Sequence, residues 1–249
     1  MTTETDPQRF SRSELLLGEL GLARLAQSHV AVFGIGGVGS YAVEALARSG
    51  IGALTLIDYD RVTVTNINRQ LFALDSTVDR VKVEVAAERC RLINPSLRIT
   101  ALCERYAPQS GPDLLAESFD FVLDCIDTIT AKLDLIMQCK QRQLAVISSM
   151  GAANKTDTGK IRQADLFETR HCRLARIMRK ELRKRGVQSD VPVVYSTEEY
   201  LPDSTQPSAP RQKGVVVERP PMGSLSTVPP VFGLMMAGYV INHLAGVPS

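Results

Sequence analysis

The polar segment DYDRVTVTNINRQ, residues 58–70, follows the glycine-rich GIGGVG and carries the side chains best suited to chemistry. An acid about 20 residues after a glycine-rich turn is typical of nucleotide sites, where the carboxylate accepts hydrogen bonds from ribose hydroxyls. In GIGGVG, Gly34 permits a tight turn, Gly36 lets the backbone approach a phosphate, and Gly39 lets the following helix pack closely. The motif and Asp58 together predict a nucleotide site.

The residues beyond Asp58 favour a triphosphate over a nicotinamide dinucleotide. A nicotinamide enzyme needs a proton-transferring residue later in the chain, and each of the three histidines has a context more typical of a structural role. Asn66, Arg69 and Lys82 instead offer groups that bind phosphates. Chemistry at a triphosphate requires cations aimed at the leaving oxygens, and Arg12 adds one more before the expected fold begins.

Two acids in VLDCIDT follow the fourth expected strand, at the edge of a parallel sheet where ligands bind. Magnesium takes one or two protein carboxylates and fills its other positions with water and phosphate oxygens. We therefore predict that Asp127 binds Mg²⁺ together with ATP. Asp124 is nearer the strand interior and is interpreted as a cap of the next helix.

The hydrophobic pattern places these residues in an α/β fold, a Rossmann-like doubly wound, mostly parallel sheet with helices on both faces. Residues 11–27 have helical spacing broken by Gly18 and Gly21, which predicts two short helices. The expected strands then cover 29–34, 53–58, 97–103, 119–127 and 144–150, and the expected helices cover 37–50, 78–95 and 128–143.

After Met150 the pattern predicts a loop, a basic helix, two short strands and a final apolar helix. The basic helix is expected at about residues 165–185, and the strands near VPVVYS and GVVVE. The apolar run VPPVFGLMMAGYVINHLAG is too short to span a bilayer comfortably, so we expect a buried helix and no transmembrane segment.

We expect one domain over residues 1–249. Its parts are N-terminal helices (1–28), a nucleotide-binding core (29–150) and a smaller, irregular C-terminal extension on the substrate side (151–249). The five cysteines are scattered without a C-x-x-C pair, which predicts no zinc site and favours reduced thiols in the cytoplasm. The start of the chain lacks the pattern of a secretory signal.

The expected basic helix, RHCRLARIMRKELRKRG, carries a cationic face opposite an apolar one. On composition alone, a solvated helix face explains this pattern as well as a binding surface does. A nucleic-acid substrate favours phosphate contacts, which position the nucleic acid without reading its bases. The cations on this face are Arg173, Arg176, Arg179, Lys180, Arg183 and Lys184.

These motifs together resemble the E1-like (ThiF/MoeB-type) adenylyltransferase superfamily, which includes the molybdopterin-synthase and thiamine-biosynthesis adenylyltransferases and the ubiquitin-activating enzymes. The shared pattern is RFSR, GIGGVGS, LIDYDRVTVTNINRQ, the lysine of DRVKVEVAAERCRLINP, and DCIDT, over roughly residues 9–150. Within the superfamily the chain is most similar to the tRNA threonylcarbamoyladenosine dehydratases. That similarity lies in EALARSGIGALTLIDYDRVTVTNINRQ, in VVYSTEEYLP, which matches the group's VFSTE, and in the absence of paired zinc cysteines.

The resemblance implies a role for each matched position. Asp58 holds the ribose and Asp127 binds magnesium, while Asn66, Arg69 and Lys82 hold the phosphates. Arg12 matches an arginine that the family donates from the second subunit of a homodimer. The expected ATP-binding set is Gly34, Gly36, Gly37, Gly39, Asp58, Asp60, Asn66, Arg69 and Lys82, and the expected catalytic set is Arg12, Arg69, Lys82 and Asp127.

The implied reaction is ATP-dependent activation of the carboxylate of N6-threonylcarbamoyladenosine at tRNA position 37, followed by ring closure on the acyl adenylate. The implied tRNA-binding residues are Arg173, Arg176, Arg179, Lys180, Arg183 and Lys184. Ring closure requires little beyond positioning, so no covalent cysteine is expected, and Cys172 is interpreted as structural. The alternative is an adenylyltransferase for a sulfur-carrier or ubiquitin-like protein, which the missing zinc cysteines disfavour. A sulfur-transfer protein is a further candidate partner. A third alternative is a nicotinamide-binding oxidoreductase or regulator, and the only motif that favours it is GIGGVG.

Overall fold

The computed structural model describes residues 7–199 and 222–248, in which seven strands form one sheet. The strand order is β3-β2-β1-β4-β5-β7-β6, and every neighbouring pair is parallel except β6 with β7. The strands are β1 (His29–Phe33), β2 (Ala53–Ile57), β3 (Arg98–Leu102), β4 (Phe121–Asp124), β5 (Val146–Ser149), β6 (Ile161–Asp165) and β7 (Pro192–Ser196). The predicted mostly parallel, doubly wound sheet is confirmed.

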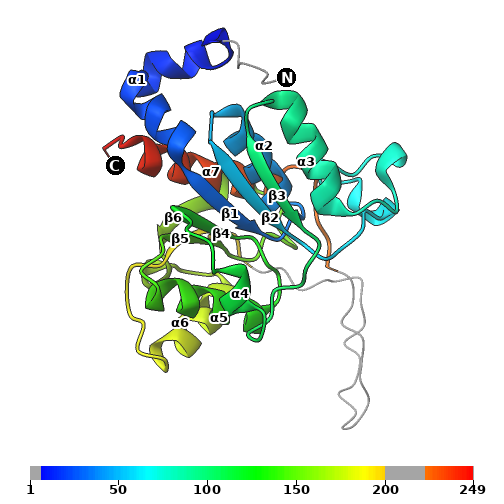
Figure 1. Ribbon diagram of the computed structural model, residues 1–249. Coiled ribbons are helices and arrows are strands. Elements are labelled where there is room, and N and C mark those ends of the chain that lie inside the picture. The colour runs from blue at the N-terminus through cyan, green and yellow to red at the C-terminus, as the bar shows by residue number, and fades with distance from the viewer. Residues whose placement is uncertain (1–6, 200–221, 249) are drawn as a thin grey trace.

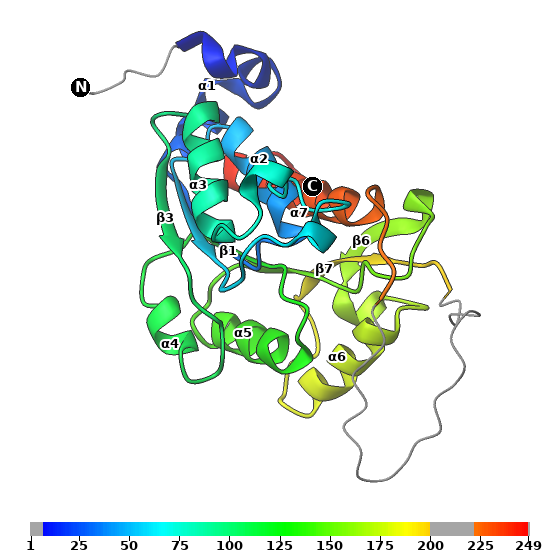
Figure 2. The ribbon, with the colours of Figure 1, turned by 90° about the vertical axis from the view of Figure 1, so that its right-hand side faces the viewer.

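Helices cover both faces of this sheet (Figures 1 and 2). On one face lie α1 (Ser11–Gln27), α2 (Gly39–Arg48), α3 (Lys82–Ile93) and α7 (Val228–Ala245). On the other lie α4 (Gly111–Leu114), α5 (Ile129–Gln141) and α6 (Arg173–Arg183). Short 3₁₀ turns are η1 (Pro7–Phe10), η2 (Val64–Asn66), η3 (Asp75–Thr77), η4 (Thr158–Lys160) and η5 (Leu166–Glu168).

The central strands are the most deeply buried part of the described chain. Every residue of β2, β4 and β5 is buried, which agrees with their nearly continuous apolar runs. Because parallel strands place their carboxyl ends at one edge, the loops after β1, β2, β4 and β5 meet there. This carboxyl edge carries the residues predicted to bind the nucleotide.

Helix α1 contains the predicted interruption at Gly18, where φ is 71° and ψ is 167°. Such a positive φ suits glycine, whereas Gly21 lies within the second helical half. The first half projects from the body of the molecule, at the upper left of Figure 1.

Helix α7 is long and apolar enough, by length and composition, to cross a membrane. Half of this helix is buried inside the fold. It packs against α2 so closely that a Cβ on Gly233 would lie 2.2 Å from the carbonyl oxygen of Val38. Its position in the hydrophobic core explains its apolar composition, as expected for a buried helix.

The C-terminal third differs from the sequence expectation in two places. The basic helix begins at Arg173 and is shorter than predicted, because residues 166–168 form the 3₁₀ turn η5 instead. Residues 161–165, which were expected as part of a loop, form the edge strand β6. The strand expected near GVVVE lies outside the described residues.

Candidate nucleotide site

The glycine-rich loop joins β1 to α2 at the carboxyl edge, and its glycines have different surroundings. A Cβ on Gly34, where φ is 91°, would lie 2.8 Å from the Cys125 carbonyl oxygen, and one on Gly39 would lie 1.8 Å from the Gly34 carbonyl oxygen. On Gly36 the nearest atom would be the Gln70 amide nitrogen at 3.9 Å. Gly34 and Gly39 therefore serve close packing, whereas Gly36 presents an open backbone to a ligand.

Asp58 connects this loop to the end of β2. Its carboxylate accepts hydrogen bonds from the amides of Ile35 (2.6 Å) and Asp60 (2.8 Å). Burial raises the pKa of the Asp58 carboxyl, against the opposing effects of the Lys82 charge and these two amides. A carboxylate has about four acceptor positions, so Asp58 retains capacity for ribose hydroxyls.

Lys82, the first residue of α3, is oriented toward the same edge by an ion pair. Its Nζ lies 2.8 Å from Asp60 Oδ2, and its side chain is 7% exposed while that of Asp60 is 46% exposed. The nearly buried ammonium can donate three hydrogen bonds, and Asp60 accepts one of them. Asp60 therefore positions the lysine.

Asn66 and Arg69, in the segment TNINRQ, have different local partners. Asn66 is buried, and its side-chain oxygen accepts from the Thr63 amide at 3.2 Å, which caps η2. The Arg69 guanidinium donates to the Thr65 carbonyl (2.9 Å) and to the Asn68 side chain (3.0 Å). Its stem lies against the glycine loop, because a Cβ on Gly37 would be 3.3 Å from Arg69 Cγ.

The acids after β4 differ in role. Asp124 is fully buried and accepts hydrogen bonds from Lys132 Nζ (2.7 Å) and Ser148 Oγ (2.6 Å), an arrangement that the helix-cap interpretation missed. Asp124 also accepts from the Ile126 amide at 3.2 Å and so holds the loop that carries Asp127. Lys132 lies between Ala131 and Leu133 of α5, and its burial beside Asp124 becomes visible only from the packing of these elements.

Asp127 is exposed on that loop, with a hydrogen bond from the Thr128 hydroxyl at 3.2 Å. Burial and the nearby carboxylates of Asp60 and Asp127 raise the pKa of Tyr59. The acids after β2 and β4 therefore lie on the same part of the edge. No group of three or more His, Cys, Asp or Glu side chains within 7–199 and 222–248 is arranged to hold a metal ion.

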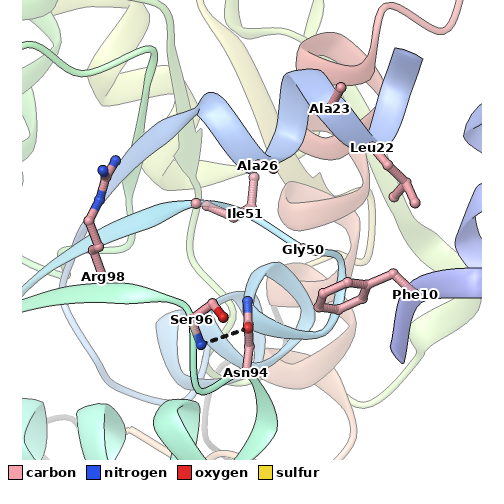
Figure 3. A pocket seen from close by; sticks show the side chains of 10 residues that line it. Phe10, Leu22, Ala23, Ala26, Gly50, Ile51, Asn94, Ser96 and Arg98 are labelled. Atoms are coloured by element: carbon pink, nitrogen blue, oxygen red, sulfur yellow. Dashed lines mark hydrogen bonds between the residues drawn. The ribbon is translucent and has the colours of Figure 1, made fainter. Parts of the chain in front are cut away.

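Arg12 does not join this cluster within one chain. It is exposed on the first turn of α1, just after Phe10, whose ring lies beside Gly50 at the opposite, amino-terminal edge of the sheet. There an open hollow of about 410 Å³ lies between α1 and the strand ends (Figure 3). Its walls are mainly apolar, from Phe10, Leu22 and Ile51, and Arg98 is the one charged residue among the described residues that line it.

Helix α6 has the predicted two faces. Ala175, Met178 and Leu182 are buried, while Arg176 and Lys180 are exposed, and the side chains of these two form no hydrogen bond or ion pair with any described residue. The other predicted cations have partners in their own chain. Arg179 donates to the Thr169 carbonyl (2.9 Å), Lys184 pairs with Glu181 (2.7 Å), and Arg183 lies over the Phe167 ring. Arg173 is exposed, and it too interacts with another group of the protein.

Cys172 precedes α6 and is buried. Its sulfur accepts a hydrogen bond from the Ala175 amide at 3.5 Å, so it caps the helix. This hydrogen bond gives Cys172 a structural role at the start of α6.

Comparisons with known proteins agree with this fold. The ThiF family model matches residues 10–249. A Bacillus subtilis (strain 168) protein named tRNA threonylcarbamoyladenosine dehydratase is 41% identical over 239 residues, covering 95% of this chain and 94% of the relative. The Salmonella typhimurium molybdopterin-synthase adenylyltransferase is 37% identical over 147 residues, 58% of each chain. The solved Escherichia coli tRNA N6-threonylcarbamoyladenosine dehydratase in complex with ATP superposes with a TM-score of 0.86 at 34% identity, covering 96% of this chain and 94% of that one.

Proposed function

The chain belongs to the ThiF family, and from this membership we propose that it is an ATP-dependent tRNA dehydratase. It adenylates the carboxylate of N6-threonylcarbamoyladenosine at tRNA position 37 and closes the modified base into its cyclic form. The observation that carries the proposal is the convergence of Asp58, Lys82 and Arg69 around an open glycine loop, in a chain that matches a dehydratase along 94% of that relative's length.

The first step joins two anions, and the site supplies the opposing charge. A carboxylate oxygen of the substrate attacks the α-phosphorus of ATP, the bond to the bridging oxygen breaks, and pyrophosphate leaves with the bonding electrons. Lys82 and Arg69 lie beside the loop that receives the phosphates and stabilise the charge on the leaving oxygens. Asp58 accepts the ribose hydroxyls and so fixes the nucleoside.

Magnesium fits this site through Asp127. Its exposed carboxylate supplies one protein oxygen, which matches the preference of Mg²⁺ for few protein ligands plus water and phosphate oxygens. When bound, the ion neutralises phosphate charge. Asp124 holds the loop backbone through its bond to Ile126 and thereby places Asp127.

The second step needs positioning more than catalysis by a residue. The carbamoyl group of the substrate attacks the acyl carbon, AMP leaves, and the nucleoside has lost one water overall. Nucleophile and electrophile belong to one molecule, which gives a high effective concentration. Burial raises the pKa of the thiol of Cys125, the cysteine nearest the glycine loop, so it stays protonated and unsuited to covalent catalysis.

The tRNA is proposed to lie along α6. Arg176 and Lys180 are exposed without partners among the described residues and can pair with phosphates, and Arg173, Arg183 and Lys184 are exposed beside them. Arg179 contributes by fixing the helix start, because its guanidinium is bound to Thr169.

A homodimer is proposed to complete the site. Arg12 lies at the amino-terminal edge of its own sheet, so it can act at the carboxyl edge only of a second copy. Leu15, Leu16 and Leu20 on the projecting α1 are 77%, 86% and 76% exposed, which is an apolar surface suited to such an interface. We further propose that residues 1–249 act as one unit in the cytoplasm.

The alternative is activation of a sulfur-carrier or ubiquitin-like protein. The adenylyltransferase relatives support it more distantly, because they match only 58% of the chain. A sulfur-transfer partner would be an additional component under either reading.

The test is incubation of the full chain with ATP, Mg²⁺ and threonylcarbamoylated tRNA, followed by mass analysis of the nucleosides. The expected result is loss of one water from the modified nucleoside with stoichiometric AMP and pyrophosphate. An unchanged nucleoside mass, with pyrophosphate exchange stimulated by a protein ending in Gly-Gly, would establish the alternative instead.

A further inference from the structure

The side chain of Asn68 bridges two segments that are far apart in the sequence. Its Oδ1 accepts a hydrogen bond from Arg69 Nη1 at 3.0 Å, and its Nδ2 donates to the carbonyl oxygen of Ser224 at 2.9 Å. A guanidinium can only donate and a carbonyl can only accept, so the amide has a single orientation that satisfies both. A side chain that can only donate hydrogen bonds, or only accept them, cannot make the same bridge.

The partner segment, residues 222–227, leads into α7 at the carboxyl edge. On one side the Gly223 carbonyl accepts from the Asn154 amide (2.8 Å), in the loop after β5. On the other side Ser224 is held by Asn68. The segment is thus anchored to loops on both sides of the candidate site.

Arg69 is held from several directions at this point. Its guanidinium donates to the Thr65 carbonyl as well as to Asn68, and its stem contacts the glycine loop at Gly37. A Cβ on Gly37 would also lie 3.0 Å from Pro229 Cβ, so the start of α7 meets the same loop. Arg69 therefore lies where the glycine loop and the entry to α7 approach each other.

We propose that Asn68 is a positioning residue that holds the Arg69 guanidinium toward the phosphates and is itself anchored by the Ser224 carbonyl. This inference rests on the proposed function, because it assigns Arg69 to the triphosphate. Asn68 is exposed, and its side chain bonds to Arg69 and to the Ser224 carbonyl, so it acts through Arg69.

The test is a double-mutant cycle with Asn68→Ala, Arg69→Ala and the double variant, measured on ATP affinity and on tRNA-dependent turnover. Loss of Asn68 alone is expected to lower turnover by about tenfold, as for loss of a charge-assisted hydrogen bond. In the Arg69→Ala background the same change is expected to have less than about a twofold effect, because its partner is already absent. Gln141→Ala, an exposed amide truncation at the other edge, is the matched control.

Additive losses in the cycle would overturn the inference, since Asn68 would then act independently of Arg69. A turnover of Asn68→Ala equal to the parent would overturn it as well. Melting temperatures of all variants separate these outcomes from unfolding. If the parent shows no tRNA-dependent turnover but the cycle on ATP affinity is non-additive, the substrate assignment fails while the role of Asn68 stands.

Discussion

Both the candidate nucleotide site and helix α6 present cationic side chains, but they hold them differently. Lys82 is nearly buried and paired with Asp60, and Arg69 is bonded to Thr65 and Asn68. On α6, Arg176 and Lys180 extend into solvent without a partner in the described part of the chain. Oriented cations suit a ligand whose phosphates must lie within ångströms of a reacting centre, whereas free cations suit a large polyanion that binds in several registers.

The largest expected effect concerns the glycines that shape the nucleotide site. Gly39→Ala places a Cβ 1.8 Å from the Gly34 carbonyl, so we expect a fall in Tm on the order of 10 °C and loss of ATP binding. Gly36→Ala has open space and should change Tm by less than about 2 °C. Its methyl group should still weaken ATP binding by about tenfold or more, the cost of overpacking against a phosphate.

Thermal unfolding and ATP titration of the two variants separate packing from binding within one loop. If Gly36→Ala binds ATP as the parent does, the phosphates do not approach the loop at Gly36. The nucleotide site would then lie elsewhere on the carboxyl edge.

A second prediction concerns charge at the reacting phosphates. Arg69→Ala and Asp127→Ala should each lower turnover by on the order of a hundredfold, because each removes a group that acts on developing charge. Both side chains are at least partly exposed, so Tm should stay close to that of the parent. Steady-state pyrophosphate release with modified tRNA measures the effect, and an intact rate in either variant would show that its role is misassigned.

The smallest effect is expected on α6. Replacing Arg176 and Lys180 together by glutamine should weaken tRNA binding by about tenfold and reduce the slope of log affinity against log salt by about two. ATP affinity should not change. Arg91→Gln, an exposed charge removal on α3, is the control, and a parent-like salt slope in the double variant would mean that tRNA does not contact this face.

The features of the fold and of the candidate site that depend on short sequence motifs could be predicted from the sequence. The positions of Gly34, Gly39, Asp58 and Lys82 follow from short motifs attached to strand ends, and the sheet follows from apolar runs that alternate with helices. The assignment of their ligands remains a prediction. The bridge from Asn68 to Ser224 spans 156 residues, and no local pattern indicates it.

Two further features depended on tertiary contacts. Strand β6 has mixed polar and apolar residues and lies at the sheet edge beside β7, so its sequence lacks a buried run. The Asp124–Lys132–Ser148 network joins three elements, and only their packing shows that Lys132 is buried. On α6, periodicity correctly separated the buried side chains from the exposed ones, but it could not show that Arg179 turns back to Thr169.

A crystal structure of the full chain with a non-hydrolysable ATP analogue and Mg²⁺ would show where the phosphates bind. We expect ribose hydroxyls on Asp58, phosphate oxygens within hydrogen-bond distance of Lys82 and Arg69, and the metal on Asp127. An analogue bound with its phosphates away from Lys82 and Arg69, or seated in the hollow beside Phe10, would contradict this expectation.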